Sequence, residues 1–330
     1  MRKTNIVIVG YGAIGKQYYT LLRKNFKNYQ IIIVSKHKKK EQNNSEAIFE
    51  NSLAYVLKKY RIYIAIVCSP ASEHLSNLTT LLSNKIHVLV EKPLFDKPIK
   101  KKSLNNLLNL IDKNKLIVFT GYLLRHHPLL IKLQNELRAH PKKNIINIEI
   151  NTTSFLPNWR SSPYQLSVSA QKKLGGGVLN ELSHEIDIIY NLFGMPKSCF
   201  ARLMNTKKLE IDVEDVAEAI INVDSKLKIF LHLDFSNYFE ARYIKVNYKQ
   251  YSLLLDFFRG KLIKRERNKQ SESFIKVDKS SLLLNQLNNF LHSINQKKFS
   301  NKNFLSSVNV TRLIGKLKKS SLSNSEIKIY

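Results

Sequence analysis

Cysteines, carboxylates and long apolar runs are all scarce in this 330-residue chain. The two cysteines, Cys68 and Cys199, are too few and too isolated for a disulfide framework or a thiolate metal site. No apolar stretch approaches the length that spans a membrane. The apolar run near the start ends at Gly10 without a small-residue cleavage site after it, so we expect no signal peptide. These absences predict a cytoplasmic protein without a membrane partner.

Carboxylates number only 25 against 54 lysines and arginines, which gives a formal net charge of +29. A charge of this size suits a nucleic acid or an anionic membrane. The excess is spread along the whole chain, however, and no basic stripe is interleaved with aromatic residues. We therefore predict no nucleic-acid partner and a bias toward anionic small molecules. A polyanion-binding protein is the last-ranked alternative, and it predicts salt-sensitive retention on DNA or heparin.

The first third of the chain alternates short apolar runs with amphipathic stretches of helical spacing. The apolar runs lie at residues 6–9, 31–34, 62–67, 86–90 and 116–120. Strands that are apolar throughout and separated by helices are typical of a parallel sheet covered on both faces. With right-handed crossovers, this order predicts an α/β, doubly wound nucleotide-binding domain, the Rossmann fold, over residues 1–121.

After Gly121 the pattern changes to alternating apolar and polar residues. Such stretches lie at residues 146–150, 217–223, 228–235 and 243–248, and two closing helices are expected at 282–294 and 308–317. Alternation is typical of half-buried antiparallel strands. Residues 122–330 are therefore predicted to form a second, α+β domain that binds substrate.

Residues 10–15, Gly-Tyr-Gly-Ala-Ile-Gly, match the G-x-G-x-x-G pattern between a strand and a helix. Gly10 permits the tight turn, Gly12 lets the backbone approach a pyrophosphate, and Gly15 allows close helix–strand packing. The phosphates of a dinucleotide would lie on N–H groups at the positive helix end, at Ala13 and Ile14.

The second strand ends at Ser35 and Lys36, within a basic run at 36–40, and offers no carboxylate for the ribose hydroxyls of NAD. A hydroxyl and cations fit a ribose 2′-phosphate instead. NADP(H) is therefore the preferred cofactor, with NAD(H) as the alternative. The competing interpretation is that these lysines are part of the general excess.

Two further motifs follow the next two strands, at the sheet edge where doubly wound folds bind ligands. Ser69-Pro70 comes directly after the strand at 62–67, with His74 at the start of the following helix. Glu91-Lys92-Pro93 follows the strand at 86–90. We predict cofactor contacts at Ser69, Pro70, His74, Glu91 and Lys92.

With these motifs in this order, the chain resembles the Gfo/Idh/MocA family, whose members are NAD(P)-dependent oxidoreductases acting mostly on sugars, polyols and nucleotide sugars. The resemblance rests on residues 10–15, 69–74, 91–93, 121–128, 175–187 and 213–215. It implies a C-terminal, largely antiparallel open sheet that often forms the oligomer interface, and hence a homodimer or homotetramer. Residues 156–160 and 169–177 are similar to a branch associated with surface-polysaccharide and nonulosonic-acid sugar gene clusters.

Oxidising a sugar hydroxyl requires loss of a hydride from carbon and of a proton from oxygen, so a positioned base must accompany the nicotinamide. Lys92 is predicted to hydrogen-bond the reacting oxygen and to exchange its proton. A lysine beside a cationic ring is disfavoured in its charged form, which suits this role. His184, whose imidazole titrates near neutral pH, is the second catalytic candidate.

Asn180, His184 and Asp187 would share one face of a helix that follows three glycines at 175–177. The glycines would let the backbone pass close to the cofactor, and Asp187 would orient His184. The family's usual catalytic aspartate falls on Asn180, which orients a substrate oxygen but is no base. Whether Asn180 or the adjacent Glu181 takes over the aspartate's place stays open.

Three other residues are predicted to bind substrate. Trp159, the only tryptophan, and Arg160 are suited to a sugar ring and to a carboxylate or phosphate, and His127 would line the cleft. Packing of Trp159 at the domain junction is an equally weighted alternative. No metal is expected, because His184 and Asp187 lack a third ligand at suitable spacing.

The sequence thus predicts an NADP(H)-preferring sugar oxidoreductase. The rival is a regulator that binds NADP and sugar without turnover, as some members of the family it resembles do; the absence of the family's usual aspartate at Asn180 keeps this alternative open.

Overall fold

The computed structural model describes residues 4–36 and 46–329, so most of the basic run at 36–40, from His37 on, lies outside the described residues. The chain forms two compact units. The first comprises the residues up to Phe95, Ile99–Gly121 and Lys279–Ser307; the second comprises Asp96–Pro98, Tyr122–Asp278 and the residues from Val308 on. A boundary thus falls after Gly121, as the sequence suggested, but residues 279–307 join the first unit, whereas the sequence analysis placed them in the second.

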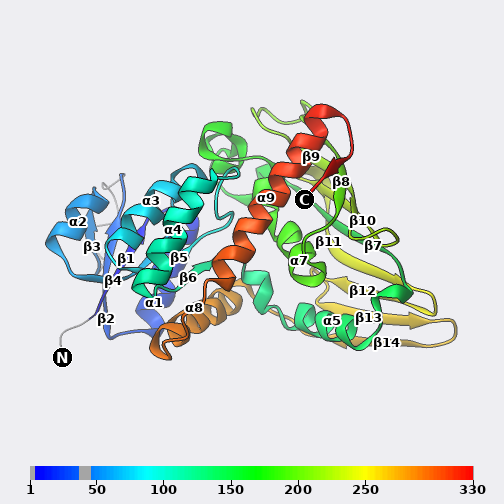
Figure 1. The fold of residues 1–330 in the computed structure, drawn as a ribbon, viewed down its shortest axis with the longest axis horizontal. Helices are drawn as coiled ribbons and strands as arrows, with labels where there is room; N and C mark the ends of the chain where they lie inside the picture. Colours follow the sequence, from blue (N-terminus) through cyan, green and yellow to red (C-terminus); the bar gives the residue numbers. More distant parts are fainter. Residues whose placement is uncertain (1–3, 37–45, 330) are drawn as a thin grey trace. The chain divides into compact units, whose positions relative to one another are not determined.

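The first unit is built on a parallel six-stranded sheet (Figure 1). Its strands are β1 (Thr4–Val9), β2 (Tyr29–Val34), β3 (Ile48–Glu50), β4 (Ile62–Val67), β5 (His87–Val90) and β6 (Val118–Thr120). Their order is β3-β2-β1-β4-β5-β6. The central strands are apolar and buried because helices cover both faces of the sheet. The predicted doubly wound fold is confirmed.

The helices of this unit are α1 (Ala13–Asn25), α2 (Leu53–Lys59), α3 (Ala71–Ser83), α4 (Lys101–Asn114) and α8 (Lys279–Asn295); α9 (Lys302–Ser323) spans the last boundary between the units. From β1, the next two strands in the chain, β2 and β3, are added on one side of it. Strands β4, β5 and β6 are added on the other side of β1. With right-handed crossovers, α1 covers one face of the sheet while α3 and α4 cover the other. Doubly wound folds bind their ligands at the carboxyl ends of the strands where the order reverses, which in this unit is between β1 and β4.

The second unit contains a nine-stranded sheet in the order β14-β13-β12-β11-β7-β10-β9-β8-β15. Its strands are β7 (Ile145–Phe155), β8 (Ser198–Met204), β9 (Val216–Asn222), β10 (Lys228–Asp234), β11 (Ser236–Tyr248), β12 (Tyr251–Asp256), β13 (Lys261–Glu266), β14 (Gln270–Phe274) and β15 (Ile327–Lys328). β7 and β10 pair in parallel, and the other neighbouring strands pair antiparallel. The predicted largely antiparallel sheet is confirmed.

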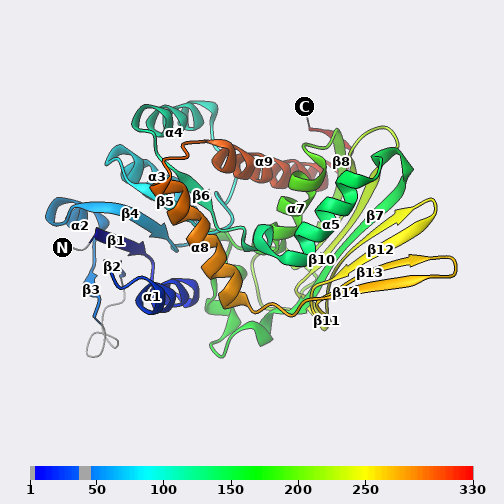
Figure 2. The same cartoon turned by 90° about the horizontal axis from the view of Figure 1, so that it is seen from below.

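Helices α5 (Pro128–Ala139) and α7 (Ser183–Phe193) lie on one face of this sheet (Figure 2). The short helix α6 (Val178–Glu181) precedes α7. The connections contain 3-10 turns: η2 (Leu123–His126), η3 (Lys142–Asn144), η4 (Leu156–Trp159), η5 (Tyr164–Leu166), η6 (Val168–Ala170) and η7 (Lys172–Leu174).

Both cysteines carry free thiols. Burial raises the pKa of Cys199 to about 11 and raises the pKa of Cys68 well above its ordinary value, so both stay protonated at neutral pH. Within residues 4–36 and 46–329, no helix is both long and apolar enough to cross a bilayer. The same residues contain no group of three or more His, Cys, Asp or Glu side chains placed to hold a metal ion.

His87 on β5 gives the first unit a measurable pH dependence. The N–H of Ile117 donates to its Nδ1 over 3.0 Å, and burial lowers the pKa of the imidazole. As the pH falls below about 6.5, the unfolded chain takes up a proton at this residue before the folded protein does, so folding loses stability. In His87→Asn the amide oxygen accepts the same bond and does not titrate.

We therefore expect the free energy of unfolding of the wild type to fall more steeply between pH 7 and pH 5 than that of His87→Asn, as measured by urea titration. His292→Asn, at an exposed position on α8, should keep the wild-type slope. Parallel slopes for the wild type and His87→Asn would contradict the assignment.

Candidate active site

The loop between β1 and α1 has the geometry of a phosphate cradle. Gly10 has a φ of +97°, and a Cβ there would lie 2.7 Å from the carbonyl carbon of Cys68. A Cβ on Gly15 would lie 2.3 Å from the carbonyl oxygen of Gly10, whereas one on Gly12 would meet no atom within 4 Å. The loop therefore packs tightly at its first and last glycines and faces open space at the middle one.

The start of α1 offers hydrogen-bond donors to this open space. The N–H of Lys16 donates to the carbonyl of Gly12 over 3.0 Å, so the three residues before Lys16 precede the helical hydrogen-bond ladder. No acidic residue lies in the first turn of α1. Backbone N–H groups at a positive helix end without nearby carboxylates suit a pyrophosphate, so these residues fit a dinucleotide.

A carboxylate that the sequence analysis missed lies near the end of β2. The Nζ atom of Lys36 is 3.1 Å from Oε1 of Glu73, which lies in the first turn of α3. The N–H of Ser35 donates to the carbonyl of Glu50 over 3.0 Å, which fixes the end of the strand. Because Glu73 is 37 residues away along the chain, no local pattern around β2 could indicate it.

The imidazole of His74 connects the loops that follow β4 and β5. Its Nδ1 lies 2.9 Å from the carbonyl oxygen of Pro93, and its Nε2 lies 2.9 Å from that of Ser69. Asn77 also donates to the hydroxyl of Ser69 over 2.9 Å. The ring is almost fully buried. His74, predicted to bind cofactor, thus holds the backbone of both predicted cofactor loops.

The side chain of Glu91 packs against the loop that carries Lys92 and hydrogen-bonds its backbone. The hydroxyl of Tyr18 on α1 donates to Oε1 of Glu91 over 2.7 Å, and the side-chain amide of Gln286 on α8 donates to the same hydroxyl over 2.6 Å. Oε2 of Glu91 accepts the N–H of Lys92 over 3.3 Å. Burial raises the pKa of Glu91, and the Tyr18 hydrogen bond opposes this shift. A Cβ on Gly121 would lie 2.5 Å from Oε1, so the close packing on Glu91 requires glycine there.

In the second unit, the backbone of the three glycines at 175–177 packs closely against other residues of the same unit. Gly175 and Gly177 have φ values of +84° and +105°. A Cβ on Gly176 would lie 2.3 Å from the carbonyl oxygen of Val168, and one on Gly177 would lie 2.5 Å from Oε1 of Glu214. These close approaches are to residues of the same unit, and the approach of this backbone to the cofactor stays a prediction.

Asn180 is almost fully buried, and its amide is held by backbone carbonyls. Its Nδ2 donates to the carbonyl of Gly175 over 2.9 Å and to that of Asp96 over 3.2 Å. Its buried Oδ1 has no hydrogen-bond partner among the described residues. Helix α6 ends at Glu181 and α7 begins at Ser183, so the prediction of one continuous helix over 180–187 is wrong.

The other candidate for the aspartate's place, Glu181, is half-buried and accepts a hydrogen bond from the hydroxyl of Ser169 over 3.1 Å. Arg160 donates to the same hydroxyl over 3.5 Å. Arg160 and Glu181 thus meet at one serine, and the choice between Asn180 and Glu181 stays open.

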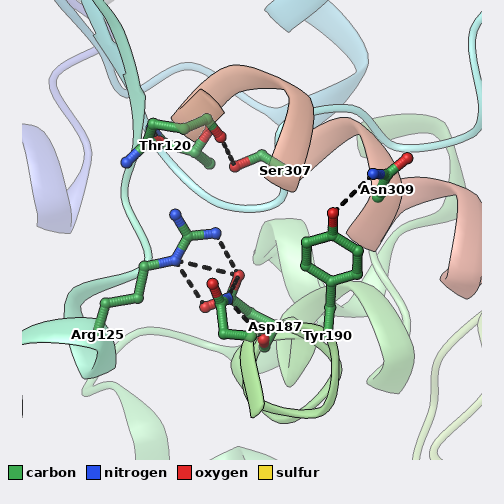
Figure 3. Close-up of polar contacts among 8 residues, drawn as sticks. Thr120, Arg125, Asp187, Tyr190, Ser307 and Asn309 are labelled. Carbon is green, nitrogen blue, oxygen red and sulfur yellow. Dashed lines mark hydrogen bonds and ion pairs between the residues drawn. The ribbon is translucent and has the colours of Figure 1, made fainter. Parts of the chain in front are cut away.

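His184 is buried on α7, with its ring edge-on to that of Tyr122 at 5.7 Å between centroids. The Arg125 guanidinium lies 5.1 Å from the centre of the Tyr122 ring and donates from Nε to Asp187 over 2.9 Å. Burial raises the pKa of Asp187, opposed by Arg125. Figure 3 shows Arg125 directed at the Asp187 carboxylate. The carboxylate expected to orient His184 pairs with Arg125, and the Tyr122 ring contacts both the Arg125 guanidinium and the imidazole.

The remaining predicted substrate residues differ in exposure. Trp159 is half-buried and lies edge-on to Phe235 at 6.0 Å, while Arg160 is exposed. His127 is buried against Phe257 at 5.1 Å. Burial lowers the pKa of His127, and the positive charge of Arg242 adds to the shift, so this imidazole is neutral at neutral pH.

The structure gathers the predicted residues into two groups. In the first unit, the carboxyl ends of the strands bring together the glycine loop, the end of β2, the start of α3 with His74 and the loop that carries Lys92. In the second unit, α6 and α7 carry Asn180 and His184. The roles of all these residues stay predictions.

Two family models match the chain in succession. Residues 4–122 match the model described as "Oxidoreductase family, NAD-binding Rossmann fold", and residues 144–252 match the "GFO/IDH/MocA C-terminal domain". Together they span about two thirds of the sequence. The chain therefore belongs to the Gfo/Idh/MocA family of oxidoreductases and has its NAD-binding Rossmann domain.

Solved structures share the fold over nearly the whole chain. Levoglucosan dehydrogenase in complex with NADH and levoglucosan has a TM-score of 0.84 at 14% identity, covering 99% of both chains. An oxidoreductase domain protein from Kribbella flavida also has a TM-score of 0.84, at 15% identity with 100% of both chains covered. An NAD binding oxidoreductase from Klebsiella pneumoniae has a TM-score of 0.78 at 12% identity, covering 99% of both. No curated protein matches the chain by sequence.

The surroundings of Asn180 predict how an aspartate at this position would change the stability of the fold. In Asn180→Asp, a carboxylate oxygen would face the carbonyls that now accept from Nδ2. We expect a loss of about 1–3 kcal/mol in the free energy of unfolding at pH 7, because two hydrogen bonds become repulsions in a buried place. The loss should shrink at acidic pH, where the protonated carboxyl donates again.

Urea unfolding at pH 7 and pH 5 tests this prediction. Asn84→Asp makes the same change where the amide donates to an exposed carbonyl, and it should cost less than about 0.5 kcal/mol. Equal stability of Asn180→Asp and the wild type at pH 7 would show that the amide orientation is wrong.

Proposed function

We propose that this protein is an NAD(P)-dependent oxidoreductase that transfers a hydride between a nicotinamide cofactor, with NADP(H) preferred, and a hydroxyl or keto group of a sugar, nucleotide sugar or polyol. The observation that carries the proposal is the Lys92 loop: a lysine at the carboxyl end of β5, fixed from below by Glu91, in the same unit as the open glycine loop. Levoglucosan dehydrogenase, a structural neighbour, has been solved with NADH and a sugar, which supports the substrate class.

The nicotinamide, when bound, accepts or supplies the hydride. Lys92 would donate a hydrogen bond to the reacting oxygen and take its proton during oxidation, or return it during reduction. Its backbone N–H is held by Glu91, so the loop is fixed before substrate arrives. His184 is the second group proposed to exchange protons, fixed against Tyr122. The buried Oδ1 of Asn180 would accept a hydrogen bond from a substrate hydroxyl.

Further contacts follow from the chemistry of the remaining side chains. Trp159 and Arg160 would bind the sugar ring and an attached anionic group, and His127, neutral at neutral pH, would add a polar contact. Gly12, Ala13 and Ile14 would bind the pyrophosphate, and the Ser69-Pro70 turn would border the cofactor.

A homodimer or homotetramer is supported by the sheet of the second unit. Phe200, Ile220 and Phe230 lie side by side on β8, β9 and β10, and each is about two-fifths exposed. A contiguous apolar row on an exposed sheet favours burial against another copy. A role in surface-polysaccharide sugar biosynthesis is the finer proposal, supported by the resemblance of residues 156–160 and 169–177.

The alternative function is a regulator of the same fold that binds NADP and sugar without turnover. It is favoured by one observation: Asn180, which stands where a catalytic aspartate is usual, is held by backbone carbonyls. Turnover separates the two functions. Purified protein mixed with NADP⁺ or NAD⁺ and a panel of sugars and nucleotide sugars should show reduced nicotinamide by its absorbance if it is an enzyme.

Replacing Lys92 tests the proposed mechanism. In Lys92→Ala, we expect turnover to fall by about 100-fold or more, because the positioned proton-exchanging group is lost. The dissociation constant for NADP⁺ should change far less than turnover, because the glycine loop and the other predicted cofactor contacts are intact. Both are measured on the same preparations, by initial rates and by calorimetry.

Lys113→Ala, at an exposed site on α4, serves as the matched control and should keep wild-type rates. Full turnover by Lys92→Ala would refute the role of this lysine. A wild type that binds NADP⁺ and sugar without turnover would identify the regulator.

A further inference from the structure

The pairing of Lys36 with Glu73 bears on how this protein distinguishes its cofactors. Lys36 follows β2 directly, and its Nζ lies 3.1 Å from Oε1 of Glu73. In doubly wound folds, a side chain at the end of the second strand meets the ribose 2′ position of the dinucleotide. Lys36 lies just after the end of β2, so it has this position in the chain. The ion pair places the Glu73 carboxylate next to it. Among the described residues, Lys36 and Glu73 thus place a cation and an anion together at the end of β2, where the 2′ group is recognised.

The ion pair is weak enough to open. The side chains of Lys36 and Glu73 are 79% and 41% exposed. Ion pairs of this exposure contribute little to stability, because water and salt screen both charges. A ligand with a strong charge of its own can therefore separate the two side chains.

We propose that Lys36 and Glu73 together recognise the 2′ position of the adenosine ribose, and that Glu73 lowers the preference for NADP over NAD that Lys36 would otherwise give. A 2′-phosphate takes Lys36 away from Glu73 and is repelled by the Glu73 carboxylate. A 2′-hydroxyl leaves the ion pair closed and donates a hydrogen bond to Glu73. The protein then accepts both cofactors, and its preference for NADP is smaller than Lys36 alone would give. This inference rests on the proposed cofactor binding.

A purely structural role for Glu73 predicts something different. An acidic residue in the first turn of α3 stabilises the positive end of that helix. If this is its only role, replacing Glu73 lowers the stability of the protein slightly and changes the affinities for NADP⁺ and NAD⁺ equally. The ratio of the two affinities therefore separates recognition of the 2′ group from helix stabilisation.

The experiment measures the dissociation constants of NADP⁺ and NAD⁺ by calorimetry for the wild type, Glu73→Gln and Lys36→Gln. Glu73→Gln should bind NADP⁺ about three- to tenfold more tightly, because the repulsion is removed and Lys36 is released. Its affinity for NAD⁺ should change less than about threefold, because the amide still accepts from a hydroxyl. Lys36→Gln should bind NADP⁺ about tenfold more weakly, with NAD⁺ little affected.

Glu46→Gln is the matched control. Glu46 is an exposed acid of the same unit whose carboxylate pairs with Arg23 at 3.2 Å, and its backbone lies near Gln30, in the first half of β2. This variant makes the same charge change away from the end of the strand and should leave the affinity ratio within about twofold of the wild type.

The outcomes distinguish the two proposals. A Glu73→Gln variant whose NADP⁺ to NAD⁺ affinity ratio matches that of the wild type overturns this inference and leaves the proposed function standing. An equal shift in Glu46→Gln also overturns it, because the effect would then be one of net charge. A wild type that binds neither dinucleotide overturns both proposals.

Discussion

A buried carboxylate determines how the candidate catalytic loop is held. Glu91 stands at the end of a fully buried strand, where an isolated charge would be costly. Tyr18 and the N–H of Lys92 offset that cost by donating to its two oxygens. The same hydrogen bonds fix the backbone that carries Lys92. The loop geometry therefore depends on three segments that are far apart in sequence: α1, the end of β5, and α8, which supplies Gln286.

This dependence explains why residues 279–307 belong with the first unit. Their place in the chain, after the strands of the second domain, predicted that they belong to that domain. Gln286 on α8 is 268 residues from Tyr18, yet its amide donates to the Tyr18 hydroxyl. The order of residues in the chain does not predict that α8 packs back against the first unit. The buried Tyr18 hydroxyl requires a hydrogen-bond partner, and only the folded structure identifies Gln286 as that partner.

The elements that could be predicted from the sequence are those that apolar periodicity and glycine spacing indicate. The strand at 62–67 and the helix starting at Ala13 were found with their observed bounds, because apolar runs and the glycine motif are local signals. Strands β12 to β14 were missed, since their Leu, Lys and Ser residues alternate poorly. The position of Lys92 after β5 was predicted. The partners of the site residues, such as Glu73 for Lys36 and Arg125 for Asp187, were not, because each pairing joins distant parts of the chain.

Asn180 shows how the surroundings of a buried side chain limit the residue types that fit there. Three carbonyl oxygens surround its Nδ2, which suits an amide and disfavours a carboxylate. The amide present at position 180 is therefore the side chain that these surroundings favour. Under the proposed function, proton exchange is expected of Lys92, whose backbone N–H is held by Glu91, and of His184, whose ring lies against Tyr122.

The most direct test is a crystal structure of the protein with NADP⁺, in which the position of the Lys92 ammonium relative to C4 of the nicotinamide is measured. The account predicts that Nζ lies beside the open face of the ring. A hydroxyl oxygen about 3 Å from Nζ would then place its carbon about 3.5 Å from C4. An ammonium group directed into bulk solvent, too far from C4 for one alcohol group to reach both, would contradict it.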